Sequence, residues 1–234
     1  MQPIPGIQFV DLTILIKKPK ILVIGDLHIG YEEYLTSKGV LIPKFHMKEL
    51  EDKLNAILEK TKPKLIIING DIKHEFGKIS DEEWRNTLKV IDLLSKHARL
   101  ILIKGNHDNI LGPIARKRNV EVRDYHVSEG IYICHGDKIP TGEEFRKAKT
   151  IIIGHEHPAI TIDDSIRRET YKCFLLGKYN KQNLIVMPSL NLITEGTNVL
   201  NEKLLSPFLK DINNFKVYVV GDKIYDFGKV KDHY

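Results

Sequence analysis

Cysteine is nearly absent from this sequence of 234 residues, which contains only Cys134 and Cys173. Two cysteines cannot form the disulfide framework of a small secreted domain, so we expect a reducing, cytoplasmic location. Long hydrophobic runs are absent too: the longest has four residues, for example residues 21–24, whereas a membrane-spanning helix needs roughly 18. The N-terminal residues 1–5 have neither the basic nor the apolar region of a signal peptide. We therefore expect a soluble protein with no membrane partner.

Hydrophobic residues make up 42% of the sequence and charged residues 29%, which is typical of a globular protein and excludes a disordered or fibrous one. The length suits a single domain over residues 1–234. The 36 basic and 31 acidic side chains give a net charge of +5, which favours polyanionic partners. A lysine-rich surface with scattered charges explains the same value, so charge alone identifies no partner.

Five short apolar runs recur along the first two thirds of the sequence, and each is followed by glycine and a polar residue. Uniformly apolar runs bounded by glycine are typical of strands buried on both faces of a sheet. Polar side chains just after such strands lie where open α/β sheets place their binding sites. The expected strands are residues 21–24, 65–68, 100–103, 131–134 and 151–153.

Amphipathic segments separate the first three of these strands. Apolar residues recur at helical spacing from Met47 and again from Trp84. Ser80 and Glu83 are expected to form a capping box at the start of the second helix, and a third helix is expected over residues 111–117. The alternation of strands and helices predicts parallel crossovers in a layered α/β domain.

The C-terminal third has a different character, with short or alternating strands that predict a largely antiparallel second sheet packed on the first. Gly221-Asp222 is expected to form a two-residue hairpin turn. Proline and asparagine residues between 188 and 214 predict a long surface loop. The expected strands are residues 159–162, 170–176, 184–187, 217–220 and 224–227.

The polar residues that follow these strands are mostly metal ligands by type. Carboxylate, imidazole and amide oxygen donors suit hard or borderline divalent cations. Alternate residues of an extended segment point the same way, so Asp26 and His28 can hold one ion together. The set exceeds what one tetrahedral site needs, which predicts a two-metal cluster bridged by Asp71. The expected ligands are Asp26, His28, Asp71, Asn106, His135, His155 and His157.

Any one of these motifs is weak evidence, because a single histidine at a strand end is usually an ordinary surface or core residue. Their accumulation in one chain favours the metal cluster, since otherwise many polar groups would gather at a sheet edge without compensation. The sequence has no G-x-G-x-x-G after a strand, no Gly-Lys-Ser/Thr phosphate loop and no G-x-S-x-G elbow. Nucleotide-cofactor chemistry and serine hydrolysis are therefore not indicated.

Five motifs follow one another in a fixed order: Gly25-Asp26-Leu27-His28, Gly70-Asp71-Ile72, Gly105-Asn106-His107-Asp108, His135-Gly136 and Gly154-His155-Glu156-His157. This order resembles that of the calcineurin-like metallophosphoesterases. Within that superfamily, residues 26–30 and 39–43 resemble the archaeal SbcD-related and bacterial ligase-associated phosphoesterases. The resemblance implies an α/β fold, a layered αββα sandwich of two mixed β-sheets flanked by helices. Glu156 departs from many relatives, which carry a small or hydroxyl residue between the two histidines.

The resemblance also implies residue roles. His107 has the position of the catalytic residue that protonates or stabilises the leaving oxygen, Asp108 would orient it, and His74 has the position of a substrate-binding histidine. A hydroxide held between the two metals would be the nucleophile. Mn²⁺ is the expected metal, with Fe, Zn and Ni as alternatives. The two ligand sets implied are Asp26, His28, Asp71 and His157 for one ion, and Asp71, Asn106, His135 and His155 for the other.

Three functions follow from these patterns. The first is a two-metal phosphodiesterase, or nuclease, acting on nucleic acid or nucleotides. The second is a phosphomonoesterase or nucleotide pyrophosphatase on the same metals, since substrate choice depends on cap loops (residues 30–45 and 188–210) that carry no readable code. The third is a non-catalytic metal-bound scaffold, which the presence of His107 and of every ligand disfavours. The oligomeric state stays open, with a homodimer as one option.

Overall fold

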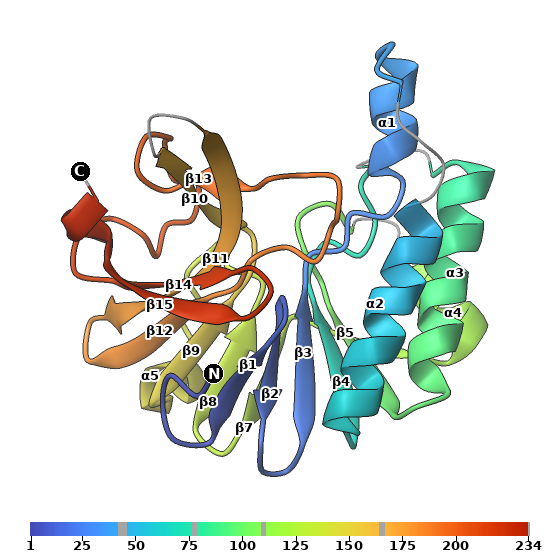
Figure 1. The fold of residues 1–234 in the computed structure, drawn as a ribbon. Helices are drawn as coiled ribbons and strands as arrows, with labels where there is room; N and C mark the ends of the chain where they lie inside the picture. Colours follow the sequence, from blue (N-terminus) through green and yellow to red (C-terminus); the bar gives the residue numbers. More distant parts are fainter. Residues whose placement is uncertain (42–45, 76–78, 109–110, 164–166, 234) are drawn as a thin grey trace.

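The computed structural model describes residues 1–41, 46–75, 79–108, 111–163 and 167–233. Two β-sheets stack face to face, and helices cover the outer face of each (Figure 1). The first sheet has the strand order β1-β2-β3-β4-β5-β6. Its strands from β3 to β6 run parallel, whereas β1 and β2 form an antiparallel hairpin beside β3. The bounds are β1 (Ile7–Val10), β2 (Thr13–Ile16), β3 (Ile21–Gly25), β4 (Leu65–Asn69), β5 (Arg99–Ile103) and β6 (Glu121–Arg123).

The second sheet has the order β13-β10-β11-β12-β9-β8-β7, with β14 beside β11 and β15 beside β14. It is mixed, because β8, β9 and β12 run parallel while the other pairs, except β10 with β13, are antiparallel. Its strands are β7 (Tyr125–Ser128), β8 (Ile131–Cys134), β9 (Thr150–Ile153), β10 (Pro158–Asp163), β11 (Arg168–Tyr179), β12 (Gln182–Val186), β13 (Thr197–Asn198), β14 (Lys216–Val220) and β15 (Ile224–Lys229).

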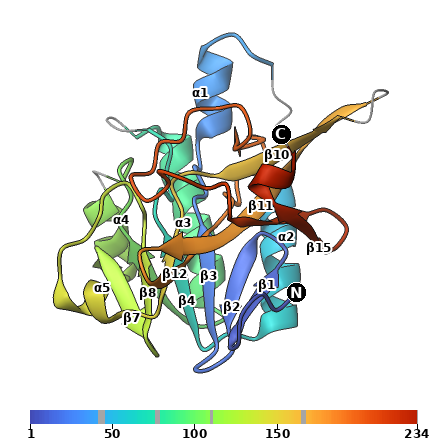
Figure 2. The ribbon, with the colours of Figure 1, turned by 90° about the vertical axis from the view of Figure 1, so that its left-hand side faces the viewer.

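The helices form the outer layers and one projection. Three of them, α2 (His46–Thr61), α3 (Asp81–Ser95) and α4 (Leu111–Arg118), pack on the first sheet. The second sheet is covered more thinly, by the short α5 (Glu143–Lys147), by the chain around residues 199–215, and by the 3₁₀ helix η1 (Val230–His233). The short α1 (Tyr31–Ser37) stands apart from these layers in both views (Figures 1 and 2). The αββα sandwich of two mixed sheets is thereby confirmed.

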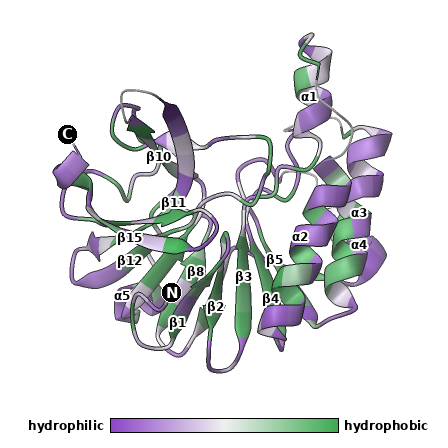
Figure 3. Ribbon diagram, in the orientation of Figure 1, coloured by the Kyte–Doolittle hydropathy of each residue, from purple (hydrophilic) through white to green (hydrophobic). Residues whose placement is uncertain are grey.

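Uniformly apolar strands form here because each strand face meets a different core. In β3, Leu22 and Ile24 face the helices, while Ile21 and Val23 face the second sheet. The same alternation holds in β8, where Ile133 lies between the sheets and the neighbouring side chains pack on the outer face. Colouring by hydropathy shows these strands green and the helices two-sided (Figure 3). The carboxyl ends of the parallel strands consequently meet at one edge, where the candidate site lies.

Several local predictions need correction. The β14–β15 connection has three residues between the paired Val220 and Ile224, instead of the two-residue turn expected at Gly221-Asp222. The Ser80 hydroxyl accepts a hydrogen bond from the backbone N–H of Glu83, as expected of a capping box. The Glu83 carboxylate, however, accepts from the backbone N–H groups of residues 74 and 75, so only half of the box forms.

The segment 188–214 was expected to be a surface loop, and that expectation is wrong for much of it. Ser189, Leu190, Ser206 and Phe208 are buried, and the segment lines both the site edge and the outer core. The other predicted cap loop covers residues 30–45. Its residues 42–45 lie outside the described residues. None of the helices in the described part of the chain is long and apolar enough to cross a membrane.

Candidate metal centre

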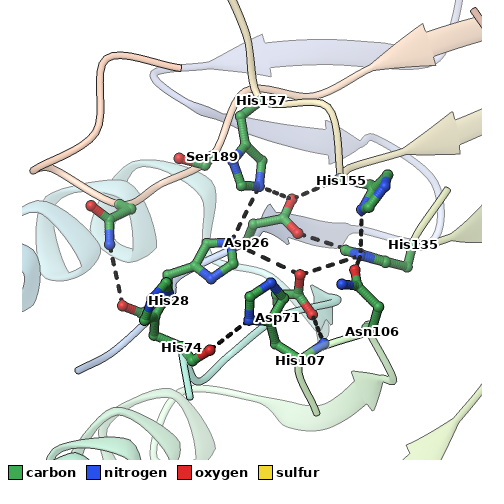
Figure 4. Close-up of polar contacts among 12 residues, drawn as sticks. Asp26, His28, Asp71, His74, Asn106, His107, His135, His155, His157 and Ser189 are labelled. Atoms are coloured by element: carbon green, nitrogen blue, oxygen red, sulfur yellow. Dashed lines mark hydrogen bonds and ion pairs between the residues drawn. The ribbon is translucent and has the colours of Figure 1, made fainter. Parts of the chain in front are cut away.

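All seven expected ligands converge at the edge where the two sheets meet (Figure 4). They come from the residues after β3, β4 and β5 in the first sheet and after β8 and β9 in the second. The side-chain amide of Asn69 donates to the carbonyl of Cys134 at 2.9 Å, which ties the end of β4 to the end of β8. The centre is therefore built across the sheet–sheet interface.

One group of ligands is formed by Asp26, His28 and His157, whose ligand atoms all lie within 4.8 Å of one another. The Nε2 atoms of His28 and His157 approach to 3.4 Å, and Nε2 of His157 lies 3.5 Å from Oδ2 of Asp26. The Asp26 carboxylate also accepts a hydrogen bond from the backbone N–H of His155 at 3.1 Å. Two imidazole nitrogens and a carboxylate that converge in this way form a typical ligand set for a divalent cation.

A second group is formed by Asp71, His135 and His155, again with ligand atoms within 4.8 Å of one another. Nε2 of His135 lies 2.8 Å from Oδ1 of Asn106 and 3.1 Å from Nδ1 of His155. The same nitrogen lies 3.3 Å from Oδ2 of Asp71. The amide oxygen of Asn106 therefore faces the same point as the other three side chains.

Asp71 lies between the two groups. Its Oδ2 is 3.3 Å from Nε2 of His135 in the second group and 3.9 Å from Nε2 of His28 in the first. Its Oδ1 accepts a hydrogen bond from the backbone N–H of His107 at 2.8 Å. Asp71 is thus the side chain in a position to bridge two ions.

The charges and orphaned atoms of these side chains fit a bound cation. Burial raises the pKa of Asp26, but the imidazoles of His157, His135 and His28 outweigh burial and hold the pKa of Asp26 well below its usual range. Oδ1 of Asp26 is buried and lacks a hydrogen-bond partner among the described residues, and Nδ1 of His135 approaches it to 3.3 Å. Buried, ionised and unsatisfied groups are costly without compensation, and a divalent cation provides it.

The histidines themselves differ in charge. Burial lowers the pKa of His135, but the carboxylates of Asp71 and Asp26 outweigh it and raise the pKa to about 9. Burial, followed by the neighbouring His157, lowers the pKa of His28 to about 3. His28 is therefore ready to bind a metal at neutral pH, whereas His135 must first lose a proton.

The backbone of the candidate ligands is strained. His28, Asp71, His155 and His157 have φ values of 45°, 35°, 65° and 50°, in the left-handed region that residues other than glycine seldom occupy. Such conformations cost about 1–3 kcal/mol each and cluster at functional sites. Four of the seven expected ligands share this feature, which indicates that the fold positions these side chains at the expense of stability.

Two glycines allow the strand ends to approach closely. A Cβ on Gly105 would collide with Oδ1 and the backbone nitrogen of Asp71, and one on Gly154 would collide with Oδ2 of Asp26. Since the atoms in the way are the candidate ligands themselves, a side chain at either position would displace a ligand.

The ring of His107 lies beside those of His28 and His74, at 5.0 and 5.5 Å between centroids, and has a defined tautomer. Its Nδ1 lies 2.5 Å from the backbone carbonyl of His74, and because a carbonyl only accepts, Nδ1 carries the proton. Nε2 is the ring nitrogen that does not take part in this contact. The expectation that Asp108 orients His107 is wrong, since the Asp108 carboxylate accepts from the backbone N–H of Gly105 at 3.0 Å.

The loop that carries His107 is held by a lysine that sequence reasoning missed. Lys73 is fully buried, and its Nζ donates to the backbone carbonyls of His107, at 2.5 Å, and of Glu75. Asp108 follows His107 in the same loop, and burial and then the nearby Asp71 raise the pKa of its carboxyl group to about 6. Lys73 thus connects the loop after β4 to the loop after β5, beneath His74 and His107.

His74 lies at the rim of the centre. Burial and then His107 lower its pKa to about 4, so it is neutral at physiological pH. Its ring is 5.5 Å from the ring of His28 and 5.5 Å from that of His107, measured between centroids. The three imidazoles form a further set with ligand atoms within 4.8 Å of one another.

The buried segment that follows β12, around Ser189 and Asn191, binds the backbone of the loop that carries His28. The Asn191 side-chain amide donates to the backbone carbonyls of Leu27 and His28 at 2.9 and 3.3 Å. Lys172, on β11, donates to Ser189 Oγ at 3.0 Å and to the carbonyl of Asn191. Sequence reasoning missed these hydrogen bonds, because no local pattern signals a contact between residues 28 and 191.

Glu156 lies between His155 and His157, where many relatives carry a small or hydroxyl residue. Its side chain points away from the centre. Its Oε2 accepts hydrogen bonds from the backbone N–H groups of Leu205 and Ser206, both at 2.8 Å. Burial raises the pKa of this carboxyl group. Glu156 is therefore a structural residue that fixes the segment 205–206 over the second sheet.

The sequence model of the calcineurin-like phosphoesterase family matches residues 19–225. The chain belongs to this family. A calcineurin-like phosphoesterase is a hydrolase that acts on phosphoester bonds and uses divalent metal ions, and the described residues provide candidate groups of histidine and aspartate for such ions. The expected superfamily is thereby confirmed.

A solved structure shares the fold of this phosphoesterase. The crystal structure of Pseudomonas putida nuclease MPE matches with a TM-score of 0.65 and 21% identity, covering 92% of each chain. The phosphoesterase YfcE of E. coli matches with a TM-score of 0.44 and 8% identity, covering 92% of this chain and 94% of the other. The search of curated proteins found no match.

Proposed function

We propose that this phosphoesterase is a two-metal phosphodiesterase that acts on nucleic acid or nucleotides. The observation that carries the proposal is the position of Asp71 Oδ2, between the His28 and His135 nitrogens of two ligand groups. We assign Mn²⁺ to both positions on the resemblance to the SbcD-related and ligase-associated phosphoesterases; the same imidazole and oxygen donors also suit Fe, Zn and Ni, which are the alternatives. The first ion would be held by Asp26, His28, Asp71 and His157, and the second by Asp71, Asn106, His135 and His155.

Two such cations, when bound, activate water for attack on phosphorus and neutralise the charge of the phosphoryl oxygens. The protein's own part is positioning and proton transfer. The carbonyl of His74 holds the proton of His107 on Nδ1, which leaves Nε2 to exchange a proton with the departing oxygen. The bond from the His107 backbone to Asp71 Oδ1 fixes the distance between this imidazole and the bridging carboxylate. General acid catalysis of this kind contributes about 10²- to 10⁴-fold to the rate.

Action on diesters is supported by the neighbour from Pseudomonas putida, which is described as a nuclease, and by the net positive charge of the chain. Action on monoesters remains the alternative. The scaffold hypothesis is disfavoured because His107 lies at the centre together with every expected ligand.

The proposal is tested with protein loaded with Mn²⁺ and assayed on bis-p-nitrophenyl phosphate, p-nitrophenyl phosphate and single-stranded DNA. We expect hydrolysis of the diester and of the DNA, and loss of both in Asp71→Asn. Asp52→Asn is the matched control, because Asp52 is an exposed aspartate on α2. Efficient hydrolysis of the monoester alone would refute the diester assignment, and stoichiometric metal with no turnover on any of the three would favour a scaffold.

A further inference from the structure

The helix α1 is unusual because none of its residues is buried. Only Ile29 and Gly30 separate it from His28, and it projects beyond the layers of the sandwich (Figures 1 and 2). Isolated helices of this length are unstable in water, and helices in proteins are normally held by an apolar face. A helix that buries no residue beside the candidate centre therefore calls for a role in contacting something else.

The start of α1 is nevertheless firmly attached. Gly30, with φ 94°, leaves no room for a Cβ against the side chain of Glu83, and Ser80 donates to the Glu33 carboxylate at 2.5 Å. Glu83 is buried and also accepts from the backbone N–H of His74 at 2.9 Å. Ser80, the N-cap of α3, thus holds α1, and Glu83 in the first turn of α3 holds the His74 loop, so the relative position of the two segments is set by the fold.

This attachment brings three aromatic rings together at the rim of the centre. The ring of His74 lies 4.7 Å from that of Tyr31 and 4.9 Å from that of Tyr34, between centroids. The two tyrosine rings are nearly parallel, with an interplanar angle of 17° at 6.1 Å. Since His74 is 5.5 Å from the rings of both His28 and His107, the aromatic row begins at the candidate centre and leads outward along α1.

The outer end of this row is partly exposed to solvent and carries a lysine over its last ring. Tyr34 is 36% exposed, and the ammonium of Lys38 lies 5.6 Å from the centre of its ring. The chain continues past α1 into Val40 and Leu41, which are 47% and 95% exposed.

We propose that Tyr31, Tyr34 and His74 form a stacking site for an unpaired nucleobase of the substrate, on the nucleotide next to the scissile phosphate. The inference rests on the proposed phosphodiesterase function and adds the class of substrate: single-stranded nucleic acid. Bases stack on aromatic side chains whatever their sequence, and Lys38 carries the charge that a neighbouring phosphate requires. A folded protein partner would not explain why the rings extend from His28 and His107 rather than lie elsewhere on the surface.

The test is a binding measurement with Mn²⁺-loaded protein. The probe is a single-stranded oligonucleotide with phosphorothioate linkages, which resist hydrolysis, and with a fluorescent 2-aminopurine that is quenched when it stacks. A second probe carries an abasic nucleotide at the same place and a dye at its end. The variants are Tyr34→Leu and the conservative Tyr34→Phe, with Tyr225→Leu as the matched control, because Tyr225 is a comparably exposed tyrosine on β15.

We expect the wild-type protein to quench the 2-aminopurine and to bind this probe more tightly than the abasic one. Tyr34→Leu should reduce that preference by about 5- to 150-fold, the range of base–aromatic stacking, while Tyr34→Phe and Tyr225→Leu retain it. A preference that Tyr34→Leu leaves unchanged, or wild-type binding without quenching, overturns the stacking site. Hydrolysis of bis-p-nitrophenyl phosphate, measured in parallel, reports on the proposed function separately, so each can fail while the other stands.

Discussion

The backbone N–H of His107 donates to Oδ1 of Asp71 at 2.8 Å, while the other oxygen of the same carboxylate lies 3.3 Å from His135. The same oxygen lies 3.9 Å from Nε2 of His28, so one side chain connects the candidate proton donor to both groups of candidate metal ligands. His107 also contacts the carbonyl of His74 through Nδ1. The position of the imidazole is set by two neighbouring loops, the one after β4 and the one after β5.

Replacing His107 by alanine is expected to reduce kcat by about 10²- to 10⁴-fold, because proton transfer to the leaving oxygen is lost. The loss should be smallest with p-nitrophenyl leaving groups, which depart without much protonation, and largest with DNA. Steady-state kinetics on both diesters measure this, with His97→Ala as the control on an exposed histidine that follows α3. Equal losses on the two substrates would show that His107 does not act as the acid.

Metal binding is expected to release protons and to strengthen as the pH rises towards about 9. The pKa of His135 is raised to about 9 by Asp71 and Asp26 against the effect of burial, and a bound metal displaces its proton. The stability of the metal-free protein depends on pH in the opposite direction. The stabilisation from protonated His135 is complete below pH 6.5 and is lost as the pH rises through about 9.

Calorimetric titration with Mn²⁺ in two buffers of different ionisation enthalpy measures this release. At pH 7.5 we expect about one proton per chain from His135, and less from the His135→Asn variant. The variant His126→Asn serves as the control, because His126 is a half-buried histidine on the edge strand β7, outside the two groups. A binding enthalpy that is the same in both buffers would contradict the charge assigned to His135.

Much of the centre was readable from the sequence because each ligand follows a strand that is apolar on both faces. Leu22 and Val23 face different cores, so the run reads as continuous apolar residues, and the polar residue after Gly25 stands out. The same pattern occurs at Asp71 and His135. Parallel strands bring these ends to one edge, which makes the convergence predictable without coordinates.

Other parts could not be predicted from local patterns. The helix α1 has no buried residue and therefore no apolar period to detect. The segment 188–214 is rich in asparagine and proline, yet Asn191 and Ser206 are buried because Lys172, Glu156 and the Leu27 carbonyl satisfy their polar groups. Such contacts join residues more than ten positions apart. The left-handed backbone of His28 and Asp71 is likewise imposed by the fold.

Glu156→Ala is expected to lower the free energy of unfolding by about 2–3 kcal/mol, because the backbone N–H groups of Leu205 and Ser206 lose their acceptor. Glu156→Gln retains one acceptor oxygen and should lose less. Urea unfolding of metal-free protein measures both, with Glu59→Ala on the exposed face of α2 as the control. If Glu156→Ala unfolds like the wild type but has lost activity, the residue belongs to the catalytic machinery instead.

Lys172 should make stability depend on pH in the alkaline range. Burial lowers the pKa of Lys172 from 10.5 to about 7, so the unfolded chain binds more protons than the folded one between these values. The cost of burying the ammonium is complete below about pH 7 and is relieved as the pH rises to 10.5, at no more than about 1.4 kcal/mol per pH unit.

The measurement is the difference in unfolding free energy between the wild type and Lys172→Met at pH 7 and pH 9, both without metal. We expect this difference to shift in favour of the wild type at the higher pH, whereas Lys216→Met, at an exposed lysine of β14, should show no such shift. A difference that is independent of pH would mean that the Ser189 and Asn191 acceptors keep Lys172 charged.

The pair of cations around Asp71 is tested most directly by crystals of the protein grown with Mn²⁺ and measured at the manganese absorption edge. The account predicts two anomalous peaks on either side of Asp71 Oδ2, one beside His28 and His157 and one beside His135 and His155. In Asp71→Asn crystals at least one peak should be lost. A single peak, or peaks that do not contact Asp71, would contradict the two-metal centre.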